Sequence, residues 1–254
     1  MLTIQVAEVE VLKNNLLPLL QISHHADFRF SRSTVSFTVA GSHNSSLIFA
    51  RLEVFHPFFI LLSSNHPREF HSCIQIDSLF LATFITGTDD RLLTIFMPDD
   101  HTFSNLVFTT CVGHLEYCSP MQMGPPLNIQ VASMAGGIFV AVNAEWFRDV
   151  ATRLSAFSTK ISVTAKDSEV KFCAAEMDFV IPIEGNRCRV EGTLGGGVRF
   201  EVSVIPLQFF IRASQLDKMV YFYGSTEKNT LVVFETGYWT NIVASNPQDR
   251  WEQL

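Results

Sequence analysis

The sequence predicts an α+β protein in which one plan of helices and strands occurs twice. Four short segments have apolar residues at helical spacing, and stretches of alternating apolar and polar residues, typical of strands, follow each of them. The 254-residue chain is 47% hydrophobic and contains 23 phenylalanines, which favours a β-rich interior filled by large side chains. A chain of this length can bury its core in one large domain or in two smaller ones.

The first half begins with a helix and continues as strands. From Val6 to Ser23 apolar residues recur at helical spacing, and Pro18 is expected to kink or end that helix late. The segment "DFRFSRSTVSFTVAG" then predicts a hairpin with its turn near Arg32–Ser33. The strand "SSLIFARLEVFHPFF", Ser45–Phe59, is expected to stop at its proline because proline cannot donate to a strand ladder.

The second half repeats this order. Asn143–Ser158 predicts a helix with Asn143 as its N-cap, and "KISVTAKDSEVKFCAAE" predicts a hairpin that turns at Lys166–Ser168. Each half also predicts a second short helix, at Asp77–Gly87 and at Pro206–Leu216, with further strands after it.

A Pro-, Gly- and Met-rich segment, "CSPMQMGPPLN" (Cys118–Asn128), separates the two halves and predicts an exposed linker. We therefore expect a first domain at residues 1–117, an interdomain connector at 118–128 and a second domain at 129–254. Each domain would carry two short helices packed on antiparallel sheet.

The composition limits the classes of function. Apolar runs such as Ser78–Ile85 are too short to span a bilayer. The chain does not start with a charged segment followed by an apolar one, so we expect no secretory signal. Five cysteines without framework spacing favour a reduced intracellular compartment. Because the net charge is −7, any contact with DNA must come from a local basic patch on an acidic body.

Catalytic and metal-binding motifs are weak. The sequence has neither a phosphate-binding Gly-Lys-Ser/Thr motif nor a nucleophile elbow, and Asp99–Asp100 next to His101 fits a turn at the end of a strand. Cys111, His114 and Cys118 are three possible zinc ligands without an obvious fourth. Buried thiols and a surface histidine are the simpler interpretation, and a metal-dependent hydrolase that also uses the two aspartates is the alternative. We predict no enzyme activity, cofactor or metal.

Basic residues concentrate on or beside the predicted helices. Such cations are often no more than solvated surface. If the helices of the two repeats lie side by side on one face of the sheets, however, the cations converge and can contact DNA phosphates. The residues concerned are Lys13, Arg148, Arg153, Arg212 and Lys218.

The chain resembles the sliding DNA clamp family, whose eukaryotic replicative member is proliferating cell nuclear antigen. The shared features in the first half are "VLK" with Lys13, the hairpin that ends in Val35, and "SSL" at Ser45–Leu47. In the second half they are "AKDSEVKF" (Ala165–Phe172) and "FFIRASQL" (Phe209–Leu216). The resemblance covers nearly the whole chain and lies in the order and spacing of these segments.

Within that family the chain is most similar to the Rad-nine-type subunit of the heterotrimeric 9-1-1 checkpoint clamp. "IFARLEVFHPFF" resembles that subunit in its aromatic-Ala pair, apolar strand and Phe-Phe pair. "CIQIDSLFLATF" (Cys73–Phe84) and "SNLVFTTCVGHLEYCSP" (Ser104–Pro120) resemble it too.

The resemblance implies a DNA-clamp (processivity) fold and a nuclear, non-enzymatic subunit of a heterotrimeric ring. The ring would encircle double-stranded DNA without sequence preference, join two other clamp subunits, be opened by an ATP-dependent clamp loader, and recruit damage-signalling and repair factors. The five cations named above would face the DNA channel. A groove on the outer face would bind peptide motifs of repair or replication enzymes, at Ala40, Leu47, Met121, Met123 and Ala244. The alternative is a divergent homotrimeric replicative clamp that acts as a polymerase processivity factor.

The sequence departs from the family pattern in three places. The second helix, "DSLFLATF", lacks the lysine usual in replicative clamps, so its DNA-facing surface would be poor in cations. Ala40, Asn44 and Ser45 stand where that family has bulkier apolar or imidazole groups. The chain ends in "ASNPQDRWEQL" without the long Ser/Thr-rich tail expected of the Rad-nine type.

Overall fold

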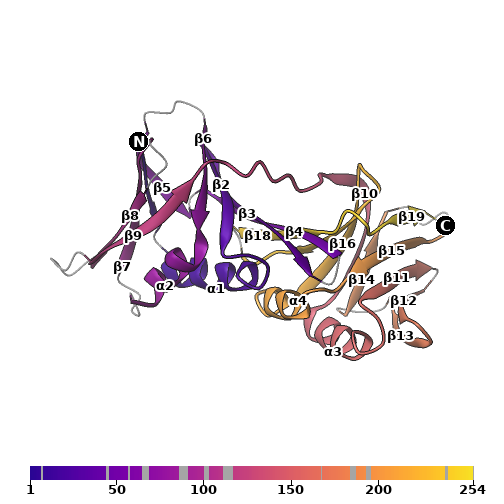
Figure 1. Ribbon diagram of the computed structural model, residues 1–254. Helices are drawn as coiled ribbons and strands as arrows, with labels where there is room; N and C mark the ends of the chain where they lie inside the picture. Colours follow the sequence, from indigo (N-terminus) through magenta and orange to yellow (C-terminus); the bar gives the residue numbers. More distant parts are fainter. Residues whose placement is uncertain are drawn as a thin grey trace. The chain divides into compact units, whose positions relative to one another are not determined.

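The computed structural model describes residues 1–6, 8–43, 46–56, 58–64, 69–85, 91–99, 103–110, 117–166, 168–183, 187–192, 196–237 and 240–253. They form two compact units, each of antiparallel sheet and helices (Figure 1). Unit 1 comprises residues 1–39, 51–129 and 238–240, and unit 2 comprises residues 40–50, 130–237 and 241–254. The tip of one hairpin of the first half therefore belongs to unit 2.

Two helices and nine strands begin in the first half of the described chain. The helices are α1 (Val9–Leu19) and α2 (Ile76–Ile85), and they pack against each other. The strands are β1 (Leu2–Val6), β2 (His25–Ser31), β3 (Thr34–His43), β4 (Ser46–Phe55), β5 (Phe59–Ser64), β6 (Glu69–Gln75), β7 (Arg91–Met97), β8 (Phe103–Thr110) and β9 (Tyr117–Gly124).

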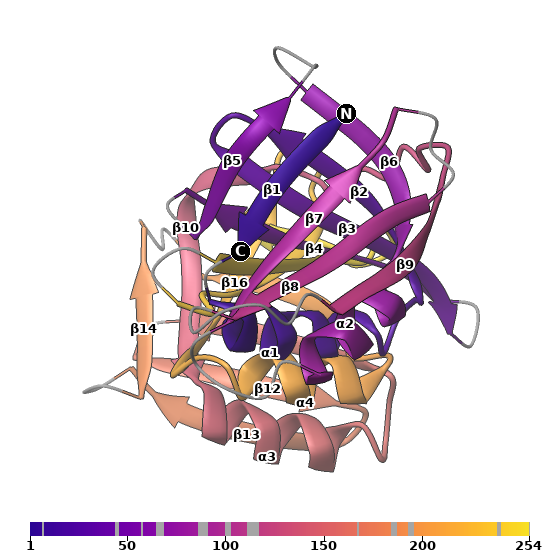
Figure 2. The same ribbon diagram turned by 90° about the vertical axis from the view of Figure 1, so that its left-hand side faces the viewer.

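Eight of these strands follow one another across an antiparallel sheet, in the order β5-β1-β7-β8-β9-β6-β2-β3. Figure 2 shows β5, β1, β7 and β8 side by side. The core of unit 1 is aromatic: the ring centre of Phe28 lies 5.3 Å from that of Phe37 and 6.3 Å from that of Phe70, both edge to face. Phe58 and Phe59, the pair after the proline, are both buried; Phe58 lies between β4 and β5, and Phe59 is the first residue of β5.

Unit 2 repeats the plan with helices α3 (Ala144–Leu154) and α4 (Leu207–Ser214), which also pack against each other. Its strands are β10 (Met134–Asn143), β11 (Lys160–Lys166), β12 (Glu169–Ala174), β13 (Met177–Pro182), β14 (Cys188–Glu191), β15 (Val198–Ser203), β16 (Met219–Ser225), β17 (Thr230–Phe234), β18 (Thr240–Ser245) and β19 (Trp251–Gln253). They pair in the orders β14-β10-β16-β17-β18 and β13-β12-β11-β15-β19.

The helix predictions are confirmed. Asn143 caps α3, because its Oδ1 accepts a hydrogen bond of 3.1 Å from the backbone N–H of Trp146. Pro18 lies in the last turn of α1, which ends one residue later. The α+β class with antiparallel sheets is likewise confirmed. No helix among the described residues is both long and apolar enough to cross a membrane.

The prediction of an exposed linker at Cys118–Asn128 is wrong for its first part. Residues up to Gly124 belong to β9, which pairs with β8 and, at its end, with β6. Met121 and Met123 are two residues apart, so they point to the same face of the strand, and both are buried. Burial of these side chains outweighs the turn-like composition of the segment.

Candidate functional site

Four of the five predicted DNA-contacting cations lie in unit 2, on α3, on α4 or just after α4. Arg148 and Arg153 belong to α3, Arg212 to α4, and Lys218 precedes β16. α3 and α4 pack together, and that these four cations share one surface stays a prediction. Lys13 belongs to α1 of unit 1.

The four cations of unit 2 differ in what they already bind. Arg148 donates from Nη1 to the backbone oxygen of Ser214 over 2.7 Å, at the C-terminal end of α4. A cation there interacts favourably with the helix dipole and joins the two helices. Arg153 pairs with Asp149 over 3.0 Å on the exposed surface of α3. Arg148 therefore has a structural role. Arg153 is held by an exposed ion pair, which is easily exchanged, and by a cation–π contact in which its guanidinium carbon lies 5.9 Å from the ring centre of Phe179 on β13.

The other two cations have fewer partners. The Nε atom of Arg212 is buried without a hydrogen-bond acceptor among the described residues. The side-chain ammonium of Lys218 makes no ion pair with a described residue, whereas its backbone oxygen accepts a hydrogen bond of 2.9 Å from the N–H of Ala144. That backbone bond fixes the start of α3 against the segment after α4. Of these two charges, Lys218 is the more available for a phosphate, because its side chain is exposed whereas Arg212 is half-buried.

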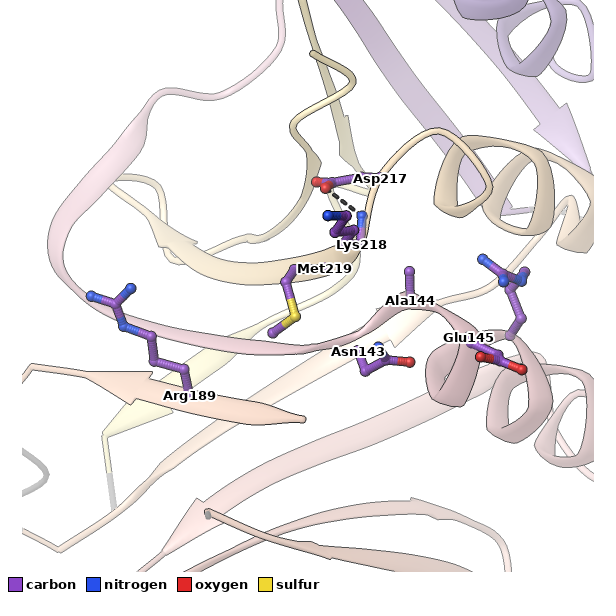
Figure 3. A pocket seen from close by; sticks show the side chains of 8 residues that line it. Asn143, Ala144, Glu145, Arg189, Asp217, Lys218 and Met219 are labelled. Atoms are coloured by element: carbon purple, nitrogen blue, oxygen red, sulfur yellow. Dashed lines mark hydrogen bonds between the residues drawn. The ribbon is translucent and has the colours of Figure 1, made fainter. Parts of the chain in front are cut away.

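An open cavity of about 580 Å³ lies at this junction (Figure 3). Figure 3 shows Asn143, Ala144 and Glu145 at the start of α3, Asp217 and Lys218 beside each other, and Arg189 on β14 at the opposite side. The charged residues of its lining are the cations Arg148, Arg189 and Lys218 and the carboxylates Glu145 and Asp217.

Several of these charges are already paired. The carboxylate of Asp217 accepts hydrogen bonds from the backbone N–H groups of Lys218 and of Glu235, the latter over 2.9 Å. Arg189 pairs with Glu191, and its guanidinium carbon lies 6.0 Å from the ring centre of Phe139. With Glu191 included, three cations face three carboxylates here, so the charge of the lining does not favour an anion over a cation. The sequence interpretation missed Arg189, because β14 and α3 are more than thirty residues apart and only the fold places them on one cavity.

In unit 1, the surface around Lys13 is partly apolar. Lys13 pairs with Glu10 over 2.6 Å, and its ammonium lies 5.0 Å from the ring centre of Phe84 on α2. Phe84 and Leu81 are both more than half exposed, and α2 carries no basic residue in its last turn. The second helix is therefore poor in cations, as expected, and its exposed side chains Leu81 and Phe84 are apolar.

The predicted peptide-groove residues have unequal access to solvent. Leu47, near the tip of the β3–β4 hairpin, is 43% exposed, and Ala40 is half-buried. Met121, Met123 and Ala244 are buried in β9 and β18, so a partner cannot contact their side chains without rearrangement. Asn44 and Ser45 lie outside the described residues.

The alternative metal and hydrolase site is mostly outside the described structure. Cys111, His114 and Asp100 are not among the described residues. Asp99 is exposed and pairs with the amino terminus of Met1. In the part of the chain that the structure describes, no group of three or more His, Cys, Asp or Glu side chains is positioned to hold a metal ion.

Cys188 precedes Arg189 on β14 and is buried, and this burial raises its pKa to about 11. A thiol with that pKa stays protonated at neutral pH, so it is a weak nucleophile there.

No protein-family model and no curated protein matches this sequence.

Proposed function

We propose that this chain is a non-enzymatic subunit of a heterotrimeric, ring-shaped DNA clamp of the 9-1-1 checkpoint type, which encircles duplex DNA in the nucleus and recruits damage-signalling and repair factors. The observation that carries the proposal is the duplication: each unit has a pair of adjacent helices on antiparallel sheet, in the same order along the chain. This is the plan that the sequence resemblance implies for a clamp subunit with two domains.

The charges of unit 2 support contact with DNA through phosphates. Arg153, Arg212 and Lys218 are three cations on or beside two packed helices of an acidic chain. A few such contacts give weak, salt-sensitive binding without sequence preference, which suits a ring that holds DNA by enclosing it. The sequence contains no nucleotide-binding motif, so ring opening is assigned to an ATP-dependent loader.

An outer strand of unit 2 supports assembly with other subunits. β13 is the last strand of its sheet and pairs with β12 among the described residues. Its exposed side chains include Met177 and Val180, which are 39% and 49% exposed and lie on opposite faces of the strand. An exposed, partly apolar edge strand invites pairing with a strand of another chain. In the proposed ring it pairs with a neighbouring clamp subunit.

Light scattering coupled to size-exclusion chromatography tests the assembly. We expect the pure chain to be a monomer that forms a ring only with two other chains, which are identified by co-purification from its native cell. A stable homotrimer of this chain alone would overturn the heterotrimer and favour the replicative-clamp alternative.

Retention on circular DNA tests the surface. The assembled ring is loaded on nicked circular DNA, and the double variant Arg153→Glu with Lys218→Glu is compared with the wild type and with a control, Lys166→Glu with Lys228→Glu. The control makes the same charge change at two exposed lysines, one at the end of β11 and one between β16 and β17, away from β13. We expect shorter retention for the first variant only, and loss of all three proteins when the DNA is linearised. Equal retention of both variants in an intact ring would remove these cations from the DNA surface.

A further inference from the structure

A fully buried carboxylate in unit 1 holds the chain segment that follows β9. Asp27 on β2 has no solvent exposure, and its Oδ1 accepts hydrogen bonds from the backbone N–H groups of Leu127 and Asn128, over 2.9 and 3.3 Å. These residues lie a hundred positions further along the chain. Residues 125–129, which we call the strap, contain neither helix nor strand.

Two side chains complete the attachment. The imidazole of His71 on β6 lies 2.7 Å from Oδ1 of Asp27, and Arg29 donates to Oδ2 from Nε and Nη2 over 3.2 and 3.1 Å. Nη2 of Arg29 also donates to the backbone oxygen of Ile129 over 3.3 Å. Arg29 thus binds both the buried carboxylate and the strap itself.

The backbone of the strap is shaped to fit this carboxylate. Asn128 has a φ of 55°, a left-handed conformation that asparagine and glycine tolerate and β-branched residues do not. This conformation turns the chain just after the two N–H groups that meet Oδ1 and directs it to Ile129, whose backbone oxygen accepts from Arg29. The side chains of Leu127 and Asn128 are exposed, so few apolar contacts hold the strap in place.

We infer that the strap is a conformational device, which Asp27 holds closed and which opens while both units stay folded. Most of the hydrogen bonds that hold the strap end at the carboxylate of Asp27. Loss of the charge of Asp27 therefore releases the strap as a whole. The two side chains that bind Asp27 are reachable from solvent, since Arg29 and His71 are 42% and 27% exposed. When closed, the strap presents Leu127 to solvent and fixes the point at which the chain leaves unit 1.

This inference does not depend on the clamp proposal, because its test needs neither DNA nor partner proteins. The test is amide hydrogen exchange of the full chain. In Asp27→Asn, the isosteric amide cannot accept from all the donors around it. We expect exchange at Leu127 and Asn128 to be at least about tenfold faster than in the wild type, with core strands of both units unchanged. Asp249→Asn is the matched control: it alters another buried carboxylate, which binds the backbone of Ser203 in unit 2, and should leave the strap unchanged.

A second pair of variants opens the strap without touching the buried residue. Asn128→Val should accelerate exchange at Leu127, because valine resists the left-handed backbone, whereas Asn128→Gly should leave it closed. Selective acceleration in Asn128→Val supports the inference even if Asp27→Asn proves too unstable to fold. Unchanged strap exchange, or acceleration spread evenly over unit 1 in both Asp27→Asn and Asn128→Val, would overturn it.

Discussion

The aromatic core of unit 2 makes a quantitative prediction about Phe222. Its side chain is fully buried, and its ring centre lies 5.9, 5.7 and 6.5 Å from those of Phe147, Phe172 and Phe200. Burial of a phenylalanine contributes about 2–3 kcal/mol, and each of the two edge-to-face contacts adds about 0.5–1 kcal/mol. Phe222→Ala should therefore lower the free energy of unfolding by about 3–5 kcal/mol, the range seen for such truncations.

Urea unfolding followed by circular dichroism and by tryptophan fluorescence measures this loss. Phe157→Ala is the matched control, because Phe157 is 57% exposed just after α3 and should lose less than about 0.5 kcal/mol. Combining Phe222→Ala with Phe172→Ala should show a coupling of about 1 kcal/mol, whereas combining it with Phe28→Ala in unit 1 should be additive. A loss below about 1 kcal/mol for Phe222→Ala, or an equal loss for Phe157→Ala, would refute the described core.

Three further predictions concern single residues of unit 2. Asn143→Ala removes the cap of α3 and should cost about 1 kcal/mol in the same unfolding assay, while Asn143→Ser should cost much less; equal losses would contradict the cap. Burial raises the pKa of Cys188 to about 11, so this thiol should resist iodoacetamide in the native protein, whereas the partly exposed Cys173 should react. Peptide mass mapping measures both reactions, and rapid native labelling of Cys188 would show that it is not buried. Burial also raises the pKa of Asp249 above 3.8, partly offset by hydrogen bonds from Ser203, so the folded state holds this proton more tightly than the unfolded state. Its stabilising effect is therefore present below pH 3.8 and is lost as pH rises through the raised pKa, and Asp249→Asn should flatten that part of the stability profile; a parallel profile would count against it.

The sequence alone determined the local elements that short-range physics controls. The four helices follow from apolar spacing, and the start of α3 follows from a single asparagine whose side chain accepts the N–H of Trp146. The hairpin of β11 and β12 follows from alternation on both sides of a polar turn. The repeat of this order along the chain predicted two similar halves, whereas only the fold assigns residues 40–50 of the first half to unit 2.

The error at the connector has a physical reason. Pro, Gly and Met in "CSPMQMGPPLN" favour a loop when composition alone is considered, yet Met121 and Met123 alternate with polar neighbours and become buried in β9. A strand partner decides such a segment, and β8 supplies it. The alternation of the two methionines was the available signal.

Only the tertiary structure decided which charges act together. The sequence placed Arg148 among free surface cations, but the packing of α3 on α4 brings its guanidinium to the backbone oxygen of Ser214. In the sequence Asp27 is one of many acidic residues, and only the fold shows that it is buried against Arg29, His71 and the strap. Helix and hairpin formation depend on neighbours within a few residues, whereas these contacts join positions tens of residues apart, which chain order alone does not specify.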